Sequence, residues 1–319
     1  MTRRRYEPTA PKPYGFVSVE PLTRRDRTRP AGHAEYKDGT VSGTLRGELR
    51  ARTPLHVASG TLEMTNNPKV PLIKAHARSG GRPVVPGSSL KGAIRSIVEA
   101  ISPSCLRITR ARRNQLPQAT AGCRDEKNLC VACRMFGSLG YQGQVRFSDA
   151  VLRKGISTGW VEMPALYAPR GRAGLYFERG QVKGRKFYRH GRPATGNTPV
   201  EACPPGAVLD FTVQFENLQP AELGLLLIAL GQGEPKLYPK LGGGKPACYG
   251  SVEVRITELE VFEEMEAAYA NYDAAAVTQD WQPYLEAAIG SDLVLAPQLK
   301  ELANLLRLDA GRTCPEGNY

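Results

Sequence analysis

Residues 207–231 read AVLDFTVQFENLQPAELGLLLIALG, and this stretch decides the fold class. Between residues 207 and 215 apolar and polar residues alternate, which is typical of a strand with one buried face. Residues 220–230 are almost continuously apolar, begin with proline and are followed by glycine, which predicts a helix. A glycine-rich segment follows at 241–250, and residues 251–261 alternate again. This half of the chain therefore predicts a strand, a helix and a second strand.

The chain before this stretch predicts a similar unit. Residues 41–54 and 144–152 have the alternation of strands. Residues 90–101 have apolar positions at helical spacing, and we expect Ser88 or Ser89 to cap this helix. The predicted order is strand, helix, strand, strand, helix, strand. That order is typical of an α+β protein with a ferredoxin-like, RRM-like βαββαβ core.

The other segments are predicted to be additions to this core. Residues 58–86 are rich in glycine, proline and asparagine and are expected to form a loop. We divide the chain into a basic N-terminal arm at 1–37, a binding domain at 38–262 with insertions at 103–135 and 153–200, and an acidic helical tail at 263–319.

The charge of the chain is unevenly distributed. Its 319 residues contain 43 Lys and Arg against 31 Asp and Glu, a net charge of +12. Residues 101–200 hold 18 basic and 5 acidic residues, whereas residues 257–319 hold 3 and 12. Because a concentrated basic surface attracts polyanions, this clustering indicates nucleic-acid binding. A generally basic surface with no such partner is the alternative interpretation. The acidic tail is expected to be a solvated helical face or a surface for a basic neighbour.

The sequence also argues against a membrane protein and an exported protein. The longest apolar run, at 223–230, is far shorter than the roughly 20 residues of a spanning helix. The N-terminus reads MTRRR and has no apolar segment, so no signal peptide is visible and we expect a cytoplasmic protein.

Four cysteines have the residue types of a metal site. A Cys-x2-Cys pair and two nearby cysteines supply soft thiolates, which suit tetrahedral zinc; they are Cys105, Cys123, Cys130 and Cys133. We expect the zinc to be structural, because four protein ligands leave no open position. Free thiols or a redox pair are the alternatives. Cys203, Cys248 and Cys314 are expected to be isolated and packed.

Two motifs are candidate anion sites. The first, LGGGKPACYG at 241–250, offers backbone amides at its glycines and positive charge at Lys245 and the preceding Lys240. The second, VPGSSLKG at 85–92, places two hydroxyls and Lys91 at the start of a helix. A flexible turn and ordinary helix capping are the alternatives.

Together these two motifs resemble the RAMP superfamily of CRISPR-associated proteins. The segment PGSSLKG is similar to the helix start of backbone subunits in type III effector complexes, and LGGGKPACYG to the glycine-rich loop of the superfamily. Further similar segments are TPLHV at 53–57, FGS at 136–138, QVRFSD at 144–149 and PYGFV at 13–17. The resemblance covers roughly residues 13–262, and four-cysteine insertions also occur in some type III backbone domains.

The resemblance implies an RNA-binding backbone subunit of a guide-RNA-directed antiviral complex. Its partners would be guide RNA, complementary target RNA and other RAMP-type subunits, with no membrane. A thumb hairpin would fall in 153–200, with basic and aromatic residues that include Tyr167, Arg170, Arg172 and Lys186. The implied RNA-binding residues are His56, Ser88, Ser89, Lys91, Arg134, Phe136, Ser138, Lys240, Gly242, Gly243, Gly244, Lys245 and Tyr249.

Cleavage of target RNA is not expected from this chain. Cleaving members of the family use an aspartate in the loop after the first strand, together with a divalent ion. No aspartate occurs here from residue 39 to 124, and Asn66 lies where the aspartate is expected. An amide carries no charge and binds a hard cation poorly. Glu63, the one carboxylate of that loop, keeps an endoribonuclease that cuts target RNA or processes guide precursor as an alternative.

The remaining alternative is a stand-alone zinc-containing RNA-binding module. None of the four histidines is expected to be catalytic. His56, at the end of a predicted strand, is expected to pack or to contact a phosphate, whereas His33, His76 and His190 are expected in exposed loops.

Overall fold

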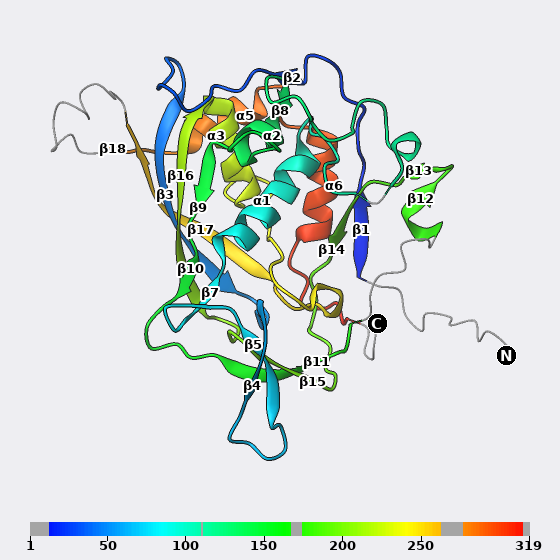
Figure 1. The fold of residues 1–319 in the computed structure, drawn as a ribbon, viewed down its shortest axis with the longest axis vertical. Coiled ribbons are helices and arrows are strands. Elements are labelled where there is room, and N and C mark those ends of the chain that lie inside the picture. Colours follow the sequence, from blue (N-terminus) through cyan, green and yellow to red (C-terminus); the bar gives the residue numbers. More distant parts are fainter. Residues whose placement is uncertain (1–12, 110, 167–173, 263–276, 315–319) are drawn as a thin grey trace.

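The main sheet of the protein has eight strands. In Figure 1 its strands lie on the left and the helices lie to their right. This computed structural model describes residues 13–109, 111–166, 174–262 and 277–314, and it is an α+β structure. The sheet order is β18 (Val277–Thr278), β17 (Val252–Val261), β3 (Val41–Ala51), β16 (Val208–Leu218), β10 (Ala150–Leu152), β7 (Arg82–Val85) and β6 (Arg78–Ser79), with β9 (Val145–Phe147) also paired to β16. All neighbouring pairs are antiparallel.

The alternation seen in the sequence decides which face of this sheet is buried. In β3, Leu45 and Leu49 are fully buried, whereas Arg46 and Glu48 lie on the opposite face. The predicted strands at 41–54, 207–215 and 251–261 are confirmed as β3, β16 and β17. The predicted strand at 144–152 is divided into β9 and β10.

Helices cover the apolar face of the sheet (Figure 1). The predicted helix at 90–101 is α1 (Gly87–Ile101), and the one at 220–230 is α3 (Pro220–Ala229), with proline at its first turn as expected. A short helix, α2 (Val131–Phe136), packs beside α1. The apolar spacing of α1 therefore corresponds to a buried face formed by Leu90, Ile94, Ile97 and Val98.

The C-terminal helices belong to the core. Helix α5 (Gln282–Ile289) packs against α3, and α6 (Ala296–Leu306) packs against α1. At Gly224 a Cβ atom would lie 1.8 Å from the Tyr284 carbonyl oxygen, so only glycine allows α3 and α5 to approach this closely. These helices have one buried and one solvated side: Leu302 and Leu306 are buried in the core, whereas the acidic Glu286 is exposed.

A second sheet projects from the body, at the bottom of Figure 1. Its order is β11 (Gly159–Met163), β15 (Thr198–Ala202), β5 (Leu72–His76) and β4 (Ala58–Met64). The expected loop at 58–86 is wrong, since this segment forms the β4–β5 hairpin and strands β6 and β7. The projecting hairpin therefore comes from 58–76, and the predicted thumb segment 153–200 supplies two supporting strands.

Three small antiparallel pairs complete the described structure. They are β1 (Tyr14–Val17) with β14 (Arg185–Tyr188), β2 (Arg27–Thr28) with β8 (Leu129–Cys130), and β12 (Phe177–Glu178) with β13 (Gln181–Val182). Short 3-10 turns lie at η1 (Arg113–Gln115), η2 (Gly174–Tyr176) and η3 (Lys245–Ala247). Tyr167, Arg170 and Arg172 of the predicted thumb lie outside the described residues. Among the described helices, none has the length and apolar character to cross a membrane.

Candidate nucleic-acid interface and metal site

The glycine-rich loop is folded against the end of β3. The amide of Gly243 donates to the carbonyl oxygen of His56 at 2.8 Å. Gly242 and Gly244 have φ angles of +72° and +70°, and a Cβ atom on Gly242 would lie 2.1 Å from the same carbonyl oxygen. Glycine is therefore required by both conformation and space. The Tyr249 hydroxyl anchors the loop from the other side, donating to the carbonyl oxygens of Glu162 and Ala194 at 3.2 and 3.1 Å.

Three backbone amides of this loop have no acceptor within the described protein. Among the described residues, the amides of Gly242, Gly244 and Lys245 have no hydrogen-bond acceptor. Successive amides in a turn with left-handed glycines form a concave donor site for anions. The amides of this loop could therefore donate hydrogen bonds to phosphate oxygens.

Two lysines place positive charge at this loop. Lys240 is buried and donates to the Tyr249 carbonyl oxygen at 3.1 Å. Burial, together with a smaller effect of the nearby Lys245, lowers its pKa to about 7. Lys245 is half-buried, burial also lowers its pKa, and it has no acceptor among the described side chains. An anion beside these two lysines would stabilise both charged forms.

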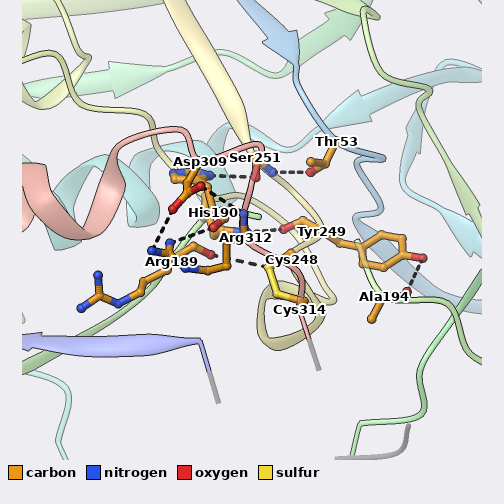
Figure 2. The surroundings of a disulfide bond; sticks show 11 residues. Thr53, Arg189, His190, Ala194, Cys248, Tyr249, Ser251, Asp309, Arg312 and Cys314 are labelled. Carbon is orange, nitrogen blue, oxygen red and sulfur yellow. Dashed lines mark hydrogen bonds and ion pairs between the residues drawn. A yellow bond between two sulfur atoms is a disulfide. The ribbon is translucent and has the colours of Figure 1, made fainter. Parts of the chain in front are cut away.

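Further basic residues reach the loop from distant parts of the chain (Figure 2). Arg189 and Arg312 lie near Cys248 and Cys314, which form a disulfide with a Cα–Cα distance of 5.9 Å. His190 lies beside them, but burial lowers its pKa to about 3, so it is uncharged at neutral pH. The expectation that these two cysteines are isolated is therefore wrong. The pairing of Cys248 with Cys314 could not be predicted from the sequence, because the two residues are 66 positions apart and only the fold brings residue 314 to the loop.

The start of α1 is occupied by the protein's own carboxylate. Asp149 accepts a hydrogen bond from the Gly87 amide at 2.8 Å, and Pro86 is the N-cap residue. The expected capping by Ser88 or Ser89 is wrong, because neither side chain makes a cap hydrogen bond. Both serines are exposed. Lys91 donates to the Val145 carbonyl oxygen at 2.7 Å, and burial lowers its pKa.

The residues around α2 have structural contacts. Arg134 forms a buried ion pair with Glu222, at 2.8 Å, and Phe136 is only 5% exposed. The Ser138 hydroxyl donates to the Cys123 carbonyl oxygen at 3.4 Å. The structure therefore separates these three residues from the glycine-rich loop and gives each a partner within the protein.

A buried polar cluster joins the projecting sheet to the body. Glu201 accepts hydrogen bonds from the His76 amide, at 2.8 Å, and from Arg78. His56 donates through Nδ1 to the Glu201 carbonyl oxygen at 2.6 Å. The His76 Nδ1 accepts from the Val57 amide, and burial lowers the pKa of this histidine to about 4.

Burial also corrects the histidine expectations. His76 and His190 are each 1% exposed, so the prediction of exposed loops is wrong for both. From the sequence, His56 is expected either to pack or to contact a phosphate, and the structure shows it packed, with its pKa lowered by burial. Glu201 was missed because an acidic residue within a strand gives no sequence signal for a shared partner.

The four predicted metal ligands lie together. The Sγ atoms of Cys105, Cys123, Cys130 and Cys133 are all within 4.8 Å of one another. In a tetrahedral zinc site, ligands at 2.3 Å imply sulfur–sulfur distances of about 3.8 Å. The Cys105 and Cys133 sulfur atoms are 3.6 Å apart, so the donor set fits a tetrahedral metal ion.

Hydrogen bonds to sulfur complete this cluster. The amides of Cys105 and Cys130 point to Sγ atoms of Cys130 and Cys123, at 3.5 and 3.4 Å. The Arg95 guanidinium lies 3.4 Å from the Cys133 sulfur and also pairs with Glu99 at 2.8 Å. Such donors and a nearby cation stabilise thiolates.

The sequence profile of the RAMP superfamily matches residues 48–253, about two thirds of the chain. The chain belongs to the RAMP superfamily. It is therefore a CRISPR-associated protein, and RNA binding is the function that the superfamily indicates. A comparison with curated proteins found no match. The matched range includes the glycine-rich loop, the α1 start and all four clustered cysteines.

In this RAMP protein the open face of the main sheet is a poor candidate for RNA. Arg153 bridges Glu48 and Asp210 at 2.6 and 2.8 Å, and Arg46 pairs with Glu258 at 2.9 Å. None of the outward positions of β3 and β16 is aromatic. The face is thus charge-balanced and offers no ring for base stacking.

Proposed function

We propose that this RAMP protein is an RNA-binding backbone subunit of a type III guide-RNA-directed effector complex. Its core would be ferredoxin-like: α1 connects β3 to β9–β10, α3 connects β16 to β17, and the antiparallel order β17-β3-β16-β10 agrees with a βαββαβ unit. The guide RNA backbone would bind at the glycine-rich loop.

One observation carries this proposal: positive charge without carboxylate partners lies next to backbone amides without acceptors in the described protein. Among the described residues, Lys245, Arg189 and Arg192 pair with no Asp or Glu, whereas Arg46, Arg146 and Arg153 of the open sheet face do. Unpaired cations attract a polyanion and release its counterions on binding. The exposed Ser88 and Ser89 are proposed to extend this contact surface, whereas Lys91 would support the fold through Val145.

The metal of the four-cysteine cluster is proposed to be zinc. A buried set of four thiolates selects soft or borderline metals, and tetrahedral geometry favours zinc among them. All four positions belong to protein ligands, so the ion would order residues 103–135 and would not act in catalysis.

The test is to purify a tagged copy from its native host and identify what comes with it. We expect small guide RNAs of uniform length and other RAMP-type subunits. Purification without RNA or sister subunits would favour the stand-alone module and overturn the proposal.

The assembled complex also tests the enzyme alternative. Glu63 is exposed on β4 of the projecting hairpin and has no cation partner among the described residues. The assembled complex is incubated with labelled complementary RNA and magnesium, once with the wild-type chain and once with Glu63→Gln. We expect the same RNA products from both, with no cut that depends on Glu63. Such a cut would establish an endoribonuclease subunit.

A further inference from the structure

The C-terminal segment is attached to the glycine-rich loop through an intermediate chain segment. The Arg192 amide donates to the Arg312 carbonyl oxygen at 2.7 Å, and the Cys314 amide donates back to the Arg192 carbonyl oxygen at 3.3 Å. Two residues later, the Ala194 amide donates to the Ala247 carbonyl oxygen at 3.1 Å. Residues 312–314, 192–194 and 247 therefore form a continuous hydrogen-bonded assembly.

The Cys248–Cys314 disulfide links the two ends of this assembly. Both cysteines are buried, and Gly191 lies against them: a Cβ atom there would be 3.0 Å from the Cys248 sulfur and 2.8 Å from the Arg312 carbonyl oxygen. Cys248 itself directly follows the η3 turn that contains Lys245, and its amide donates to the Lys245 carbonyl oxygen at 3.2 Å. The cross-link thus acts on the turn that carries the Lys245 amide, one of the three without an acceptor in the described protein.

Two arginines, Arg189 and Arg312, and the carboxylate of Asp309 lie near the disulfide (Figure 2). Arg312 donates to the His190 carbonyl oxygen at 3.0 Å, and its charge is shared with Asp309 at 2.9 Å. Arg189 is close enough to Arg312 and Arg307 that these charges, together with burial, lower its pKa. Positive charge favours the thiolate form of a reduced cysteine, whereas the burial of Cys248 and Cys314 opposes it, so exchange with a small disulfide needs the 310–314 segment to move away from the loop.

We propose that Cys248 and Cys314 are a redox-controlled latch on the glycine-rich loop. In the oxidised protein the disulfide holds residues 310–314 against the loop and orders the amides and lysines that face RNA. In the reduced protein the hydrogen bonds alone hold the segment, and the loop becomes more mobile. The effect on RNA rests on the proposed function, whereas the latch itself does not.

The redox step is thiol–disulfide exchange with a low-molecular-weight disulfide such as glutathione disulfide. The Cys248 thiolate attacks one glutathione sulfur, forms a mixed disulfide and releases one glutathione thiolate. The Cys314 thiolate then attacks the Cys248 sulfur, forms the protein disulfide and releases the second glutathione thiolate. Two protein thiols lose two electrons and two protons, and one glutathione disulfide becomes two glutathione molecules.

The first measurement concerns the latch and needs no RNA. The full chain is equilibrated with glutathione at several ratios of its reduced and oxidised forms, and peptide mapping without reductant follows the 248–314 cross-link. Hydrogen exchange of residues 245–249 and 310–314 is measured in both states. We expect the cross-link in oxidising mixtures and about tenfold faster exchange of both segments after reduction. Failure to form the cross-link, or equal exchange in both states, overturns the proposal.

The second measurement concerns RNA. A single-stranded RNA without stable secondary structure should bind the oxidised protein about fivefold more tightly than the reduced protein, since an ordered site loses less entropy on binding. Cys314→Ser is the matched control: it should bind like reduced wild type in both mixtures while keeping its four-cysteine metal content. A response of Cys314→Ser equal to that of wild type would assign the effect to other cysteines and overturn the latch.

The two failures are distinguishable. If neither state binds RNA but the cross-link and the exchange difference are present, the proposed function fails and the latch stands. If RNA binds equally in both states while exchange differs, control of RNA binding by the latch is contradicted.

Discussion

The cysteine insertion (residues 103–135) and the glycine-rich loop (residues 241–250) are both irregular, and sulfur holds both in place. The insertion gathers four thiols around one point, whereas the loop is joined to a distant segment by a disulfide. Two arginines of the insertion donate to protein acceptors: Arg134 to Glu222, and Arg107 to the Gly137 carbonyl oxygen at 3.1 Å. At the loop, Lys245 has no such acceptor among the described residues.

This comparison shows that the number of basic residues does not locate an RNA site. The densest basic region of the sequence lies at 101–200, yet several of its arginines neutralise carboxylates or bind carbonyl groups. A phosphate is attracted by charge that the protein has not already compensated. The comparison therefore predicts a structural role for the insertion and a binding role for the loop.

The largest effect should come from breaking the metal cluster. Cys130→Ser with Cys133→Ser removes two of four ligands, and residues 103–135 contain little apolar surface to replace the lost order. We expect zinc below half an equivalent by elemental analysis and a melting temperature lower by about 10 °C or more. The matched double variant Cys248→Ser, Cys314→Ser, melted under reducing conditions, should differ little from wild type. Full zinc content in the first variant would contradict the assignment.

Removing one charge at each region should separate their roles in RNA binding. Lys245→Ala should weaken binding of single-stranded RNA about tenfold and lower the log–log salt slope by about 0.7, one counterion's worth. Lys127→Ala removes an exposed lysine from the insertion and should leave both quantities within error. Filter binding at four salt concentrations measures them. Equal losses in the two variants would mean that the positive charge acts without a defined site.

The counter-charge of the metal cluster can be tested in the same way. Arg95 and Arg107 both donate to the Gly137 carbonyl oxygen. Arg95 also lies 3.4 Å from the Cys133 sulfur. Arg95→Met should release zinc to a chelator about tenfold faster, because the thiolates lose a hydrogen bond and a nearby positive charge. Arg107→Met should release zinc at the wild-type rate. If both variants release zinc equally fast, the loop contact at Gly137 and not the charge holds the metal.

The smallest effect on RNA binding should be a pH dependence at the glycine-rich loop. Burial lowers the pKa of Lys240 to about 7, well below that of an unfolded lysine. Between pH 7 and 10 the folded protein therefore binds fewer protons than the unfolded chain, and stability should rise by at most about 1.4 kcal/mol per pH unit. RNA affinity should fall over the same range, by about threefold, because the charged form of Lys240 favours phosphate. Lys240→Met should abolish both trends, measured by thermal melts and by filter binding.

The order of strands and helices could be predicted because it depends on local pattern. The alternation in β3, β16 and β17 and the helical spacing of α1 follow from which side chains face the core. The four clustered cysteines could be predicted too, since metal chemistry restricts both residue type and approximate spacing. The β4–β5 hairpin could not: its exposed residues include Leu62, Met64 and Leu72, which alternate with no buried face to reveal a strand.

The sequence by itself determined the α+β class, the glycine positions of the loop and the residue types of the metal cluster, because these depend on backbone conformation and side-chain chemistry within short segments. Only the tertiary structure decided which charges remain uncompensated, which cysteines meet and where the C-terminal helices pack. Arg134 and Lys245 look alike in the sequence, yet one neutralises the buried Glu222 and the other has no carboxylate partner among the described residues. Coulomb energy and burial depend on distances between residues far apart in the chain, and folding alone sets those distances.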